Sequence, residues 1–238
     1  MPGAMTAVRR SDADKETGTM SLRERKRRER QRTILLAAAD AFKAKGVDGA
    51  RLEEIAEKAD VSLGTVYNYF PTKDALLLAL VTLYRTEARE ERLPLIENPP
   101  TDVCETFSLL YSHLIDGALK YLDREIWRYG QVVGLVSSWE PGRQESWNNE
   151  QLLIKDQETL LAHFKDQGAL PADFQPALWA TTLHAVGLFW WQYFLANDDI
   201  SAEEAKRRIH EHFQGIFAQV ARPAERLSPA AANTSGSR

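Results

Sequence analysis

Apolar residues recur at helical spacing along most of the chain, and the clearest example lies in residues 52–70. The pattern there predicts two short helices joined by a tight turn at residues 60–62. Ser62 is a suitable N-cap for the second helix because its hydroxyl can accept a bond from a free backbone amide. The second helix turns Val66 and Phe70 inward and stops at Pro71. The first helix buries one apolar stripe, which consists of Leu52, Ile55, Ala56 and Ala59.

The outer face of the second helix carries almost no charge, which is unusual for a solvated helix. Gly64 would weaken an ordinary helix by roughly 1 kcal/mol relative to Ala, so its presence indicates that another molecule approaches the backbone there. Small, hydrogen-bonding and aromatic groups on a short exposed helix suit the major groove of DNA. The outward residues are Leu63, Gly64, Thr65, Tyr67, Asn68 and Tyr69.

Residues 30–80 resemble the DNA-binding domain of the TetR family of transcriptional regulators. The resemblance rests on Ile34, Leu35, Ala38, Ala39, Ala41, Phe42, Gly46, Ile55, Ala56, Ala59, Val61, Ser62, Gly64, Thr65, Tyr67, Tyr69, Phe70, Lys73 and Asp74. It implies a three-helix headpiece, an all-helical effector domain and a homodimer. Ala50 departs from the family, whose members usually carry Thr or Ser there as a helix cap, so Asp48 or a backbone group is expected to take that role.

The resemblance also implies roles in DNA binding for individual residues. Thr65 and Tyr67 would contact phosphates or base edges, Asn68 has the amide suited to adenine, and Lys73 matches the family's phosphate-clamping lysine. The alternative is a helix-turn-helix used only for packing or for protein contact. The full candidate DNA-binding set is Arg51, Ser62, Leu63, Gly64, Thr65, Tyr67, Asn68, Tyr69, Lys73, Arg27, Arg28 and Arg30.

The rest of the chain also reads as helices, and no strand pattern or internal repeat is present. The expected fold is all-α, with the headpiece joined through a fourth helix to a helical bundle of ligand-binding and dimerisation helices, about nine helices in total. Glycine, proline and capping residues place the remaining helices at 22–45, 75–93, 101–122, 124–138, 144–167, 176–197 and 202–221, with a turn at 140–143. Asp123 is the expected cap of one helix, and Ser201 with Glu204 forms a capping-box signature before the last.

These elements divide the chain into four segments. Residues 1–20 are expected to be a disordered tail, 21–74 the DNA-binding domain with a basic arm, 75–222 the effector and dimerisation domain, and 223–238 a second disordered tail. Met20, directly before the basic run, is an alternative natural start. The longest apolar run has seven residues, far short of the ~20 that span a bilayer. With a single cysteine, Cys104, a cytoplasmic location is expected.

Charge is distributed unevenly in this protein, whose formal net charge is −4. Residues 1–80 hold 15 Lys and Arg against 12 Asp and Glu, whereas the remainder holds 15 against 22. Residues 21–32 alone carry seven basic and two acidic side chains. A local basic patch is sufficient for phosphate binding, because counterion release depends on the contact surface. The alternative is a solvated helix end stabilised by pairs such as Glu24 and Arg28.

The eighth expected helix carries no charged side chain between residues 177 and 196. A helix that is apolar all round must be buried on more than one side. In the TetR family the last two helices pair with their copies in a four-helix interface, which predicts the same here, whereas an internal core helix is the alternative. The candidate interface residues are Leu188, Trp191, Gln192, Leu195, Phe213 and Phe217.

Aromatic residues are dense in the second domain, and as a set they predict an apolar ligand cavity, although each one alone is more typical of a core. Candidate polar groups are His113, Gln131, His184 and Gln192. Candidate counter-charges are Asp116, Asp123 and Glu125, although a place on the solvated surface is more typical of each. The expected ligand is lipophilic, aromatic or cationic, since ring faces attract cations. The candidate ligand-binding set is Phe107, Trp127, Gln131, Trp139, Phe164, Trp179, His184 and Phe189.

Catalytic and metal chemistry is not indicated. His210 and His212 lie about 200° apart on a helix, unsuited to one metal ion, and no nucleophile or nucleotide motif occurs, so neither an enzyme nor a cofactor is predicted. The expected function is a ligand-responsive repressor that binds a near-palindromic double-stranded DNA operator as a homodimer, without a membrane partner. The alternative is a TetR-fold adaptor that binds small molecules or proteins and does not read DNA.

Overall fold

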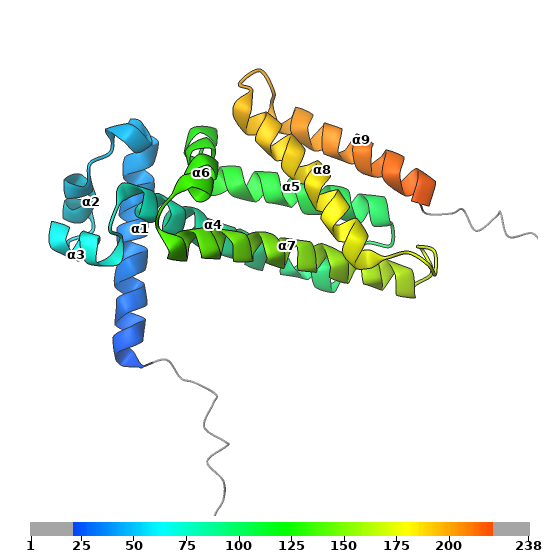
Figure 1. The fold of residues 1–238 in the computed structure, drawn as a ribbon, viewed down its shortest axis with the longest axis horizontal. Coiled ribbons are helices and arrows are strands. Elements are labelled where there is room, and N and C mark those ends of the chain that lie inside the picture. The colour runs from blue at the N-terminus through cyan, green and yellow to red at the C-terminus, as the bar shows by residue number, and fades with distance from the viewer. Residues whose placement is uncertain (1–20, 221–238) are drawn as a thin grey trace, which may run out of the picture.

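The computed structural model describes residues 21–220, and within that range it contains nine helices and no strand (Figure 1). The predicted all-α fold is therefore confirmed for this part of the chain. The tails expected at 1–20 and 223–238 lie outside it. A headpiece of three helices, α1 (Leu22–Gly49), α2 (Leu52–Lys58) and α3 (Leu63–Tyr69), lies at one end of the molecule (Figure 1).

The headpiece core matches the periodicity of the sequence. Val66 and Ile34 are completely buried, and Phe42 and Phe70 are only 1% exposed. The helical part of α1 is broken at Gly46, whose φ of 71° lies in the region that favours glycine. This break agrees with the helix end expected at residue 45.

The start of α2 differs from the expectation. Arg51 is its N-cap residue, and no side chain bonds to the first amides of the helix. Ala50 is buried, and the carboxylate of Asp48 accepts a 2.6 Å hydrogen bond from Tyr129 instead. The expectation that Asp48 caps α2 is therefore wrong, because a tertiary contact occupies that side chain.

Helix α4 (Lys73–Glu97) is longer than predicted and passes through Pro94. Thr72 caps its start by accepting a bond from the amide of Ala75 at 3.0 Å. The missing amide of Pro94 removes one bond from the carbonyl of Glu90, an exposed residue at a place where water can replace that bond. The helix therefore continues through this proline to Glu97, whereas the sequence indicated that it ends before Pro94.

The next two helices begin at aspartate caps. Asp102 caps α5 (Val103–Tyr121) and Asp123, as predicted, caps α6 (Arg124–Val136). In both cases the carboxylate accepts a bond from the amide three residues later, at 2.7 and 2.9 Å. A carboxylate at this position also interacts favourably with the helix dipole.

Helix α7 (Glu140–Asp166) begins where the sequence predicted a turn, and that prediction is wrong. Pro141 is tolerated because a helix's first turn has free amides in any case. Gly142 is required by packing, since a Cβ there would lie 2.3 Å from the ring of Trp139.

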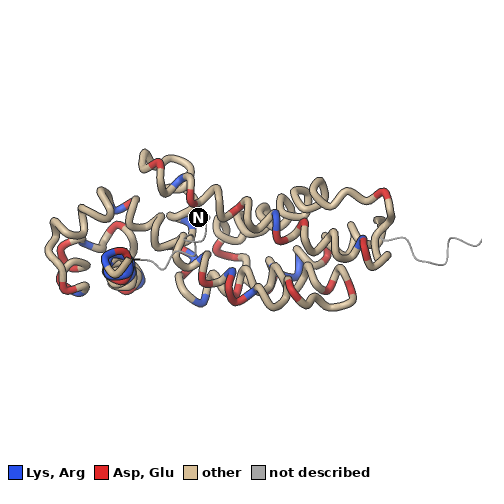
Figure 2. Tube along the Cα trace, turned by 90° about the horizontal axis from the view of Figure 1, so that it is seen from below, with Lys and Arg blue, Asp and Glu red and all other residues tan. Residues whose placement is uncertain are grey.

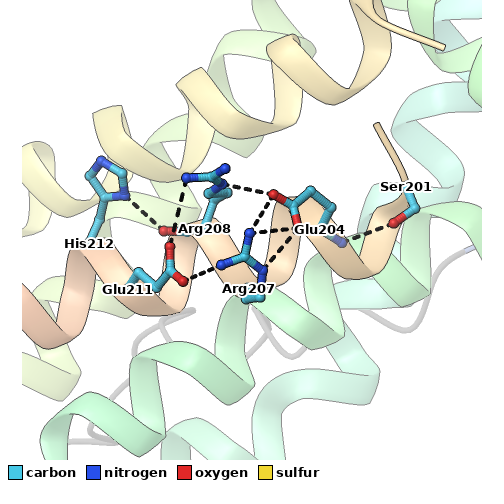
Figure 3. Close-up of polar contacts among 6 residues, drawn as sticks. All are labelled: Ser201, Glu204, Arg207, Arg208, Glu211 and His212. Atoms are coloured by element: carbon cyan, nitrogen blue, oxygen red, sulfur yellow. Dashed lines mark hydrogen bonds and ion pairs between the residues drawn. The ribbon is translucent and has the colours of Figure 1, made fainter. Parts of the chain in front are cut away.

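The last two helices, α8 (Pro176–Ala196) and α9 (Ala202–Val220), are joined by a short turn. Ser201 caps α9 by accepting a 3.1 Å bond from the amide of Glu204. Figure 3 shows that the carboxylate of Glu204 turns towards Arg207 and Arg208. Only the serine half of the predicted capping box is therefore formed.

The helical domain is a bundle in which α7 packs against α4 and α8, and α5 packs against α4 and α9. The ring of Tyr111 on α5 packs against Gly187 on α8, where a Cβ would lie 1.8 Å from that ring. The headpiece joins the bundle through contacts of α1 with α4 and α6, and α1 lies across the end of the bundle (Figure 1). The headpiece is therefore in direct contact with α4 and α6.

Candidate functional site

The outer surface of α3 is held in place by its cap. Ser62 accepts a 3.1 Å bond from the amide of Thr65, and the two hydroxyls lie 2.8 Å apart. Tyr67 is 47% exposed, and Asn68 is exposed beside it. Gly64 has open space around it, since a Cβ would approach nothing closer than 3.9 Å. The fold itself does not require a glycine there.

Two of the side chains predicted to contact DNA pack partly against the headpiece itself. Leu63 and Tyr69 are half-buried against the core. The guanidinium of Arg27 lies 6.0 Å from the centre of the Tyr69 ring, a separation at the limit of a cation–π contact. Arg27 thereby brings the basic end of α1 close to α3.

Lys73 has a structural contact that the sequence did not reveal. Its ammonium donates 3.0 Å bonds to the carbonyl oxygens of Val47 and Asp48. Since an ammonium has three donors, one remains for another acceptor. Arg51 is exposed at the start of α2 and pairs loosely with Glu53, at 3.6 Å.

The basic arm forms the first turns of α1. Residues 21–30 are all exposed, and Arg28 and Arg30 belong to this stretch. Figure 2 shows Lys and Arg concentrated on α1, which is seen end on. Ser21 and Glu24 form a reciprocal capping box that fixes the start of the helix, and the bond from Ser21 holds the pKa of Glu24 below its usual value. The arm is thus an ordered, positively charged helix end.

The helical domain contains a partly open cavity of about 110 Å³ between α4, α5, α6, α7 and α8. Of the candidate ligand-binding residues, Trp127 and His184 line it. Two candidate interface residues, Leu188 and Trp191, also line it. The complete lining is Tyr84, Arg85, Ala88, Arg89, Arg92, Tyr111, Leu114, Ile115, Ala118, Trp127, Asn149, Glu150, Leu153, His184, Gly187, Leu188 and Trp191.

Most of the other aromatic candidates lie elsewhere. Phe107 packs edge-on against Phe213 in the core, with ring centres 6.0 Å apart, and Phe164 is only 2% exposed. Trp179 stacks on Phe174, away from the cavity. These assignments to the cavity are wrong, because aromatic residues at helical spacing do not reveal which neighbouring helix covers them.

Three further candidates also lie outside the cavity lining. Trp139 packs under the first turn of α7, and Phe189 is 57% exposed on α8. Gln131 contacts two residues of the cavity lining. When its amide oxygen is oriented towards them, that oxygen accepts hydrogen bonds from Arg85 at 3.2 Å and from Trp191 at 3.3 Å.

The sequence missed the polar side of the cavity, which α4 supplies through Arg85, Arg89 and Arg92. Their i, i+4, i+7 spacing was a signal, because it places all three on one helix face. Arg89 forms a two-bond pair with the buried Asp156, at 2.9 and 2.7 Å, and this pairing raises the pKa of Arg89.

A second chain of polar contacts crosses the cavity wall. Arg85 pairs with Glu150 at 2.9 Å, and the other carboxylate oxygen lies 3.2 Å from His184. Burial alone would raise the pKa of Glu150, but the bond with His184 and the charge of Arg85 outweigh it and lower that pKa. Tyr111 donates to the oxygens of Gln157 and Leu183, and burial raises its pKa.

The candidate acidic counter-charges face elsewhere. Asp116 pairs with Lys206 at 2.7 Å, Asp123 is used as a helix cap, and Glu125 is exposed. His113 and Gln192 are also exposed and do not line the cavity. None of the three acidic groups supplies a counter-charge to the cavity, and each lies at the solvated surface instead.

The candidate dimer interface also needs correction. Leu195, Phe213 and Phe217 are at most 4% exposed within one chain, so they belong to its core. The exposed face of α8 instead presents Leu178, which is 60% exposed, and Phe189, together with Thr181, Thr182, Ala185, Gln192 and Tyr193. This face is uncharged along its length.

The two histidines of α9 point to different partners. His210 lies 2.7 Å from the hydroxyl of Ser108, and His212 lies 2.8 Å from the carbonyl of Arg208 (Figure 3). Within residues 21–220, no group of three or more His, Cys, Asp or Glu side chains could hold a metal ion. No helix in that range is long and apolar enough to cross a membrane.

Comparison with known proteins matches residues 34–80 to the family described as bacterial regulatory proteins, tetR family. The chain is 31% identical over 90 residues to the transcriptional repressor KstR of Mycolicibacterium smegmatis, covering 37% of this chain and 42% of KstR. It is 46% identical over 52 residues to the transcriptional regulator RutR of Escherichia coli, covering 22% and 24%. The matched segments thus span less than half of either relative.

The fold extends the likeness beyond the headpiece. A TetR-family transcriptional regulator from Pectobacterium atrosepticum superimposes with a TM-score of 0.63 at 19% identity, over 86% of this chain and all of that one. At this identity the likeness concerns the fold. The headpiece is therefore that of the TetR family of transcriptional regulators, and the helical domain shares the fold of a solved member of that family.

Proposed function

We propose that the protein is a transcriptional repressor that binds a near-palindromic operator as a dimer and is switched by a small ligand. The observation that carries DNA binding is the surface of α3. This helix contains no charged residue and exposes Tyr67 and Asn68, and its Gly64 has no packing role in the fold. Such a surface suits close contact with base edges and phosphates. The match to KstR, which is named as a repressor, supports repression over activation of transcription.

Basic groups lie where they can reach the flanking phosphates. The exposed turns of α1 that contain Arg28 and Arg30 are joined to α3 by the contact of Arg27 with Tyr69. Phosphate contacts position a protein on the duplex, whereas base contacts specify the sequence. We therefore assign Tyr67 and Asn68 to base reading and the arm to positioning.

Dimerisation is proposed through the uncharged face of α8. Leu178 and Phe189 expose more than half of their surface there, and large exposed apolar patches mark interaction sites. A two-fold axis through α8 would place two headpieces on successive major-groove faces, which requires recognition centres roughly 34–36 Å apart.

A ligand switch is proposed through α4, because this helix starts in the headpiece at Lys73 and lines the cavity from Tyr84 to Arg92. A ligand that prefers one position of α4 would therefore shift the population of headpiece geometries. The cavity is small for this role, since drug-sized ligands occupy pockets of roughly 300 Å³ or more.

Binding of the full-length protein to DNA from upstream of its own gene tests the proposal. We expect salt-sensitive, sequence-selective binding by gel shift, and Tyr67→Ala should weaken it by about 1–3 kcal/mol. Lys43→Ala, a change at an exposed residue on α1 away from the proposed contacts, is the matched control. Both variants should stay dimeric in light scattering.

The alternative is an adaptor with the same fold that does not read DNA. Its partner binding would not respond to Tyr67→Ala. Absence of selective binding to any genomic fragment would favour the adaptor and refute the repressor.

A further inference from the structure

Arg92 on α4 carries a buried guanidinium that pairs with no other group among residues 21–220. Arg92 is only 6% exposed, and its side chain lines the cavity. Its Nε is fully buried without a hydrogen bond, and within residues 21–220 no carboxylate lies close enough to form an ion pair with it. Buried charges in proteins are normally paired, because removing them from water is costly.

The acidic groups around the cavity are already committed to other partners. Glu150 is held between Arg85 and His184, and both oxygens of Asp156 accept bonds from Arg89. Two of the three arginines are therefore neutralised in pairs. Arg92 supplies one uncompensated positive charge to the cavity.

That charge persists at neutral pH. Burial lowers the pKa of Arg92 to about 10, which still leaves the guanidinium protonated at pH 7. Its planar array of donors matches a carboxylate, with which it can form two parallel bonds. One bound carboxylate would both pair the charge and use its free donors.

The remaining lining is largely apolar. Trp127 and Trp191 pack edge to face, with ring centres 5.7 Å apart, and Leu114 and Ile115 continue the apolar wall. Arg85, which lies 5.8 Å from the centre of the Trp127 ring, is seven residues from Arg92, or roughly 10 Å along the helix. Arg92 therefore lies about two helical turns from the part of the cavity that Trp127 lines, where Arg85 is already paired with Glu150.

We propose that this cavity binds a monoanionic organic acid, with its carboxylate on Arg92 and its apolar body directed towards Trp127 and Trp191. The inference deepens the proposed function, since it rests on the cavity being the effector site. Of the lipophilic, aromatic or cationic ligands that the sequence suggests, the inference excludes the cationic ones.

Three probes of matched length test the charge preference: octanoate, octanamide and octylamine. Their binding to the full-length protein is measured by calorimetry and by fluorescence, to which Trp127 and Trp191 contribute. We expect octanoate to bind at least about ten-fold more tightly than octanamide, and octylamine more weakly still. Equal binding of octanoate and octanamide, or tighter binding of octylamine, would overturn the proposal.

The variant Arg92→Gln tests the residue. We expect it to reduce the preference for octanoate over octanamide to less than about two-fold, with octanamide binding unchanged. Arg92→Lys should retain part of the preference, whereas Arg143→Gln, a change on the exposed surface of α7, should retain all of it. A preference that survives intact in Arg92→Gln would also overturn the assignment. If Arg92→Gln does not fold, the comparison of probes on the unaltered protein still decides.

Operator binding, measured in the same preparations, separates this inference from the proposed function. Selective DNA binding without any preference for octanoate refutes the acid site and leaves the DNA-binding proposal standing. A preference for octanoate that depends on Arg92, without selective DNA binding, supports the acid site and refutes the repressor.

Discussion

The phenol of Tyr129 on α6 donates a 2.6 Å hydrogen bond to the carboxylate of Asp48 at the end of α1. This bond ties the helical domain to the headpiece, and it raises the pKa of Tyr129. Lys73 binds the carbonyl of the same aspartate from the start of α4. The last turn of α1 is therefore held from two helices of the bundle, α4 and α6, both of which contribute residues to the cavity lining.

Tyr129→Phe should loosen this junction without unfolding the domain. Asp48 is exposed, so its freed carboxylate is solvated and the cost should be about 1 kcal/mol or less. We expect faster hydrogen exchange at the amides of residues 46–50, up to about five-fold, measured by mass spectrometry. Tyr121→Phe, which removes a 2.7 Å bond to Glu91, is the control and should leave residues 46–50 unaffected.

Gly187→Ala should destabilise the protein strongly. The added methyl group would lie 1.8 Å from the ring of Tyr111, which is buried and bonded to Gln157 and so cannot easily move. We expect a loss of about 3 kcal/mol or more in the free energy of unfolding. Gly134→Ala, where the nearest atom is 3.8 Å away, should instead gain about 0.5–1 kcal/mol. Equal melting temperatures for the two variants would contradict this packing.

Arg92→Met should stabilise the ligand-free protein. Burial lowers the pKa of Arg92 in the fold from its ordinary value to about 10, so the charged form costs stability at every pH below about 10. That cost diminishes as the pH rises from about 10 towards the ordinary pKa of an arginine side chain. We expect a gain of about 1–3 kcal/mol at pH 7, or roughly 2–10 °C in Tm.

The matched control for Arg92→Met is Arg89→Met. It leaves the buried carboxylate of Asp156 without its partner, so its Tm should fall. If Arg92→Met lowered the Tm as much as Arg89→Met does, Arg92 would have a stabilising partner. That result would refute the claim that its charge is unpaired.

Lys73→Gln should affect both stability and operator binding. Losing the bonds to Val47 and Asp48 should cost about 1 kcal/mol. If the third donor reaches a phosphate, the slope of log affinity against log salt should fall by about 0.9. Lys58→Gln, which removes an exposed pair with Asp40, should leave the slope unchanged. An unchanged slope in Lys73→Gln would leave that lysine a purely structural role.

The sequence pattern was sufficient to predict those features that depend only on residues close together in the chain. The turn at residues 60–62, the cap by Ser62 and the burial of Val66 and Phe70 all follow from helical periodicity and capping chemistry within a few residues. The all-α fold followed for the same reason, because every long segment has a helical period. The helix-turn-helix was thus determined by the sequence itself.

Tertiary contacts decided what periodicity leaves open. The periodicity of the sequence shows which face of a helix is apolar, but not which neighbouring helix covers that face. Phe213 and Phe217 were therefore expected at a dimer interface. They lie instead against Phe107 in the core. Arg92 belongs to an arginine series that resembles a solvated stripe. It is buried because α4 lies inside the bundle, between α5 and α7. The charge of the cavity is therefore a property of how the helices pack, since only the packing removes that face from water.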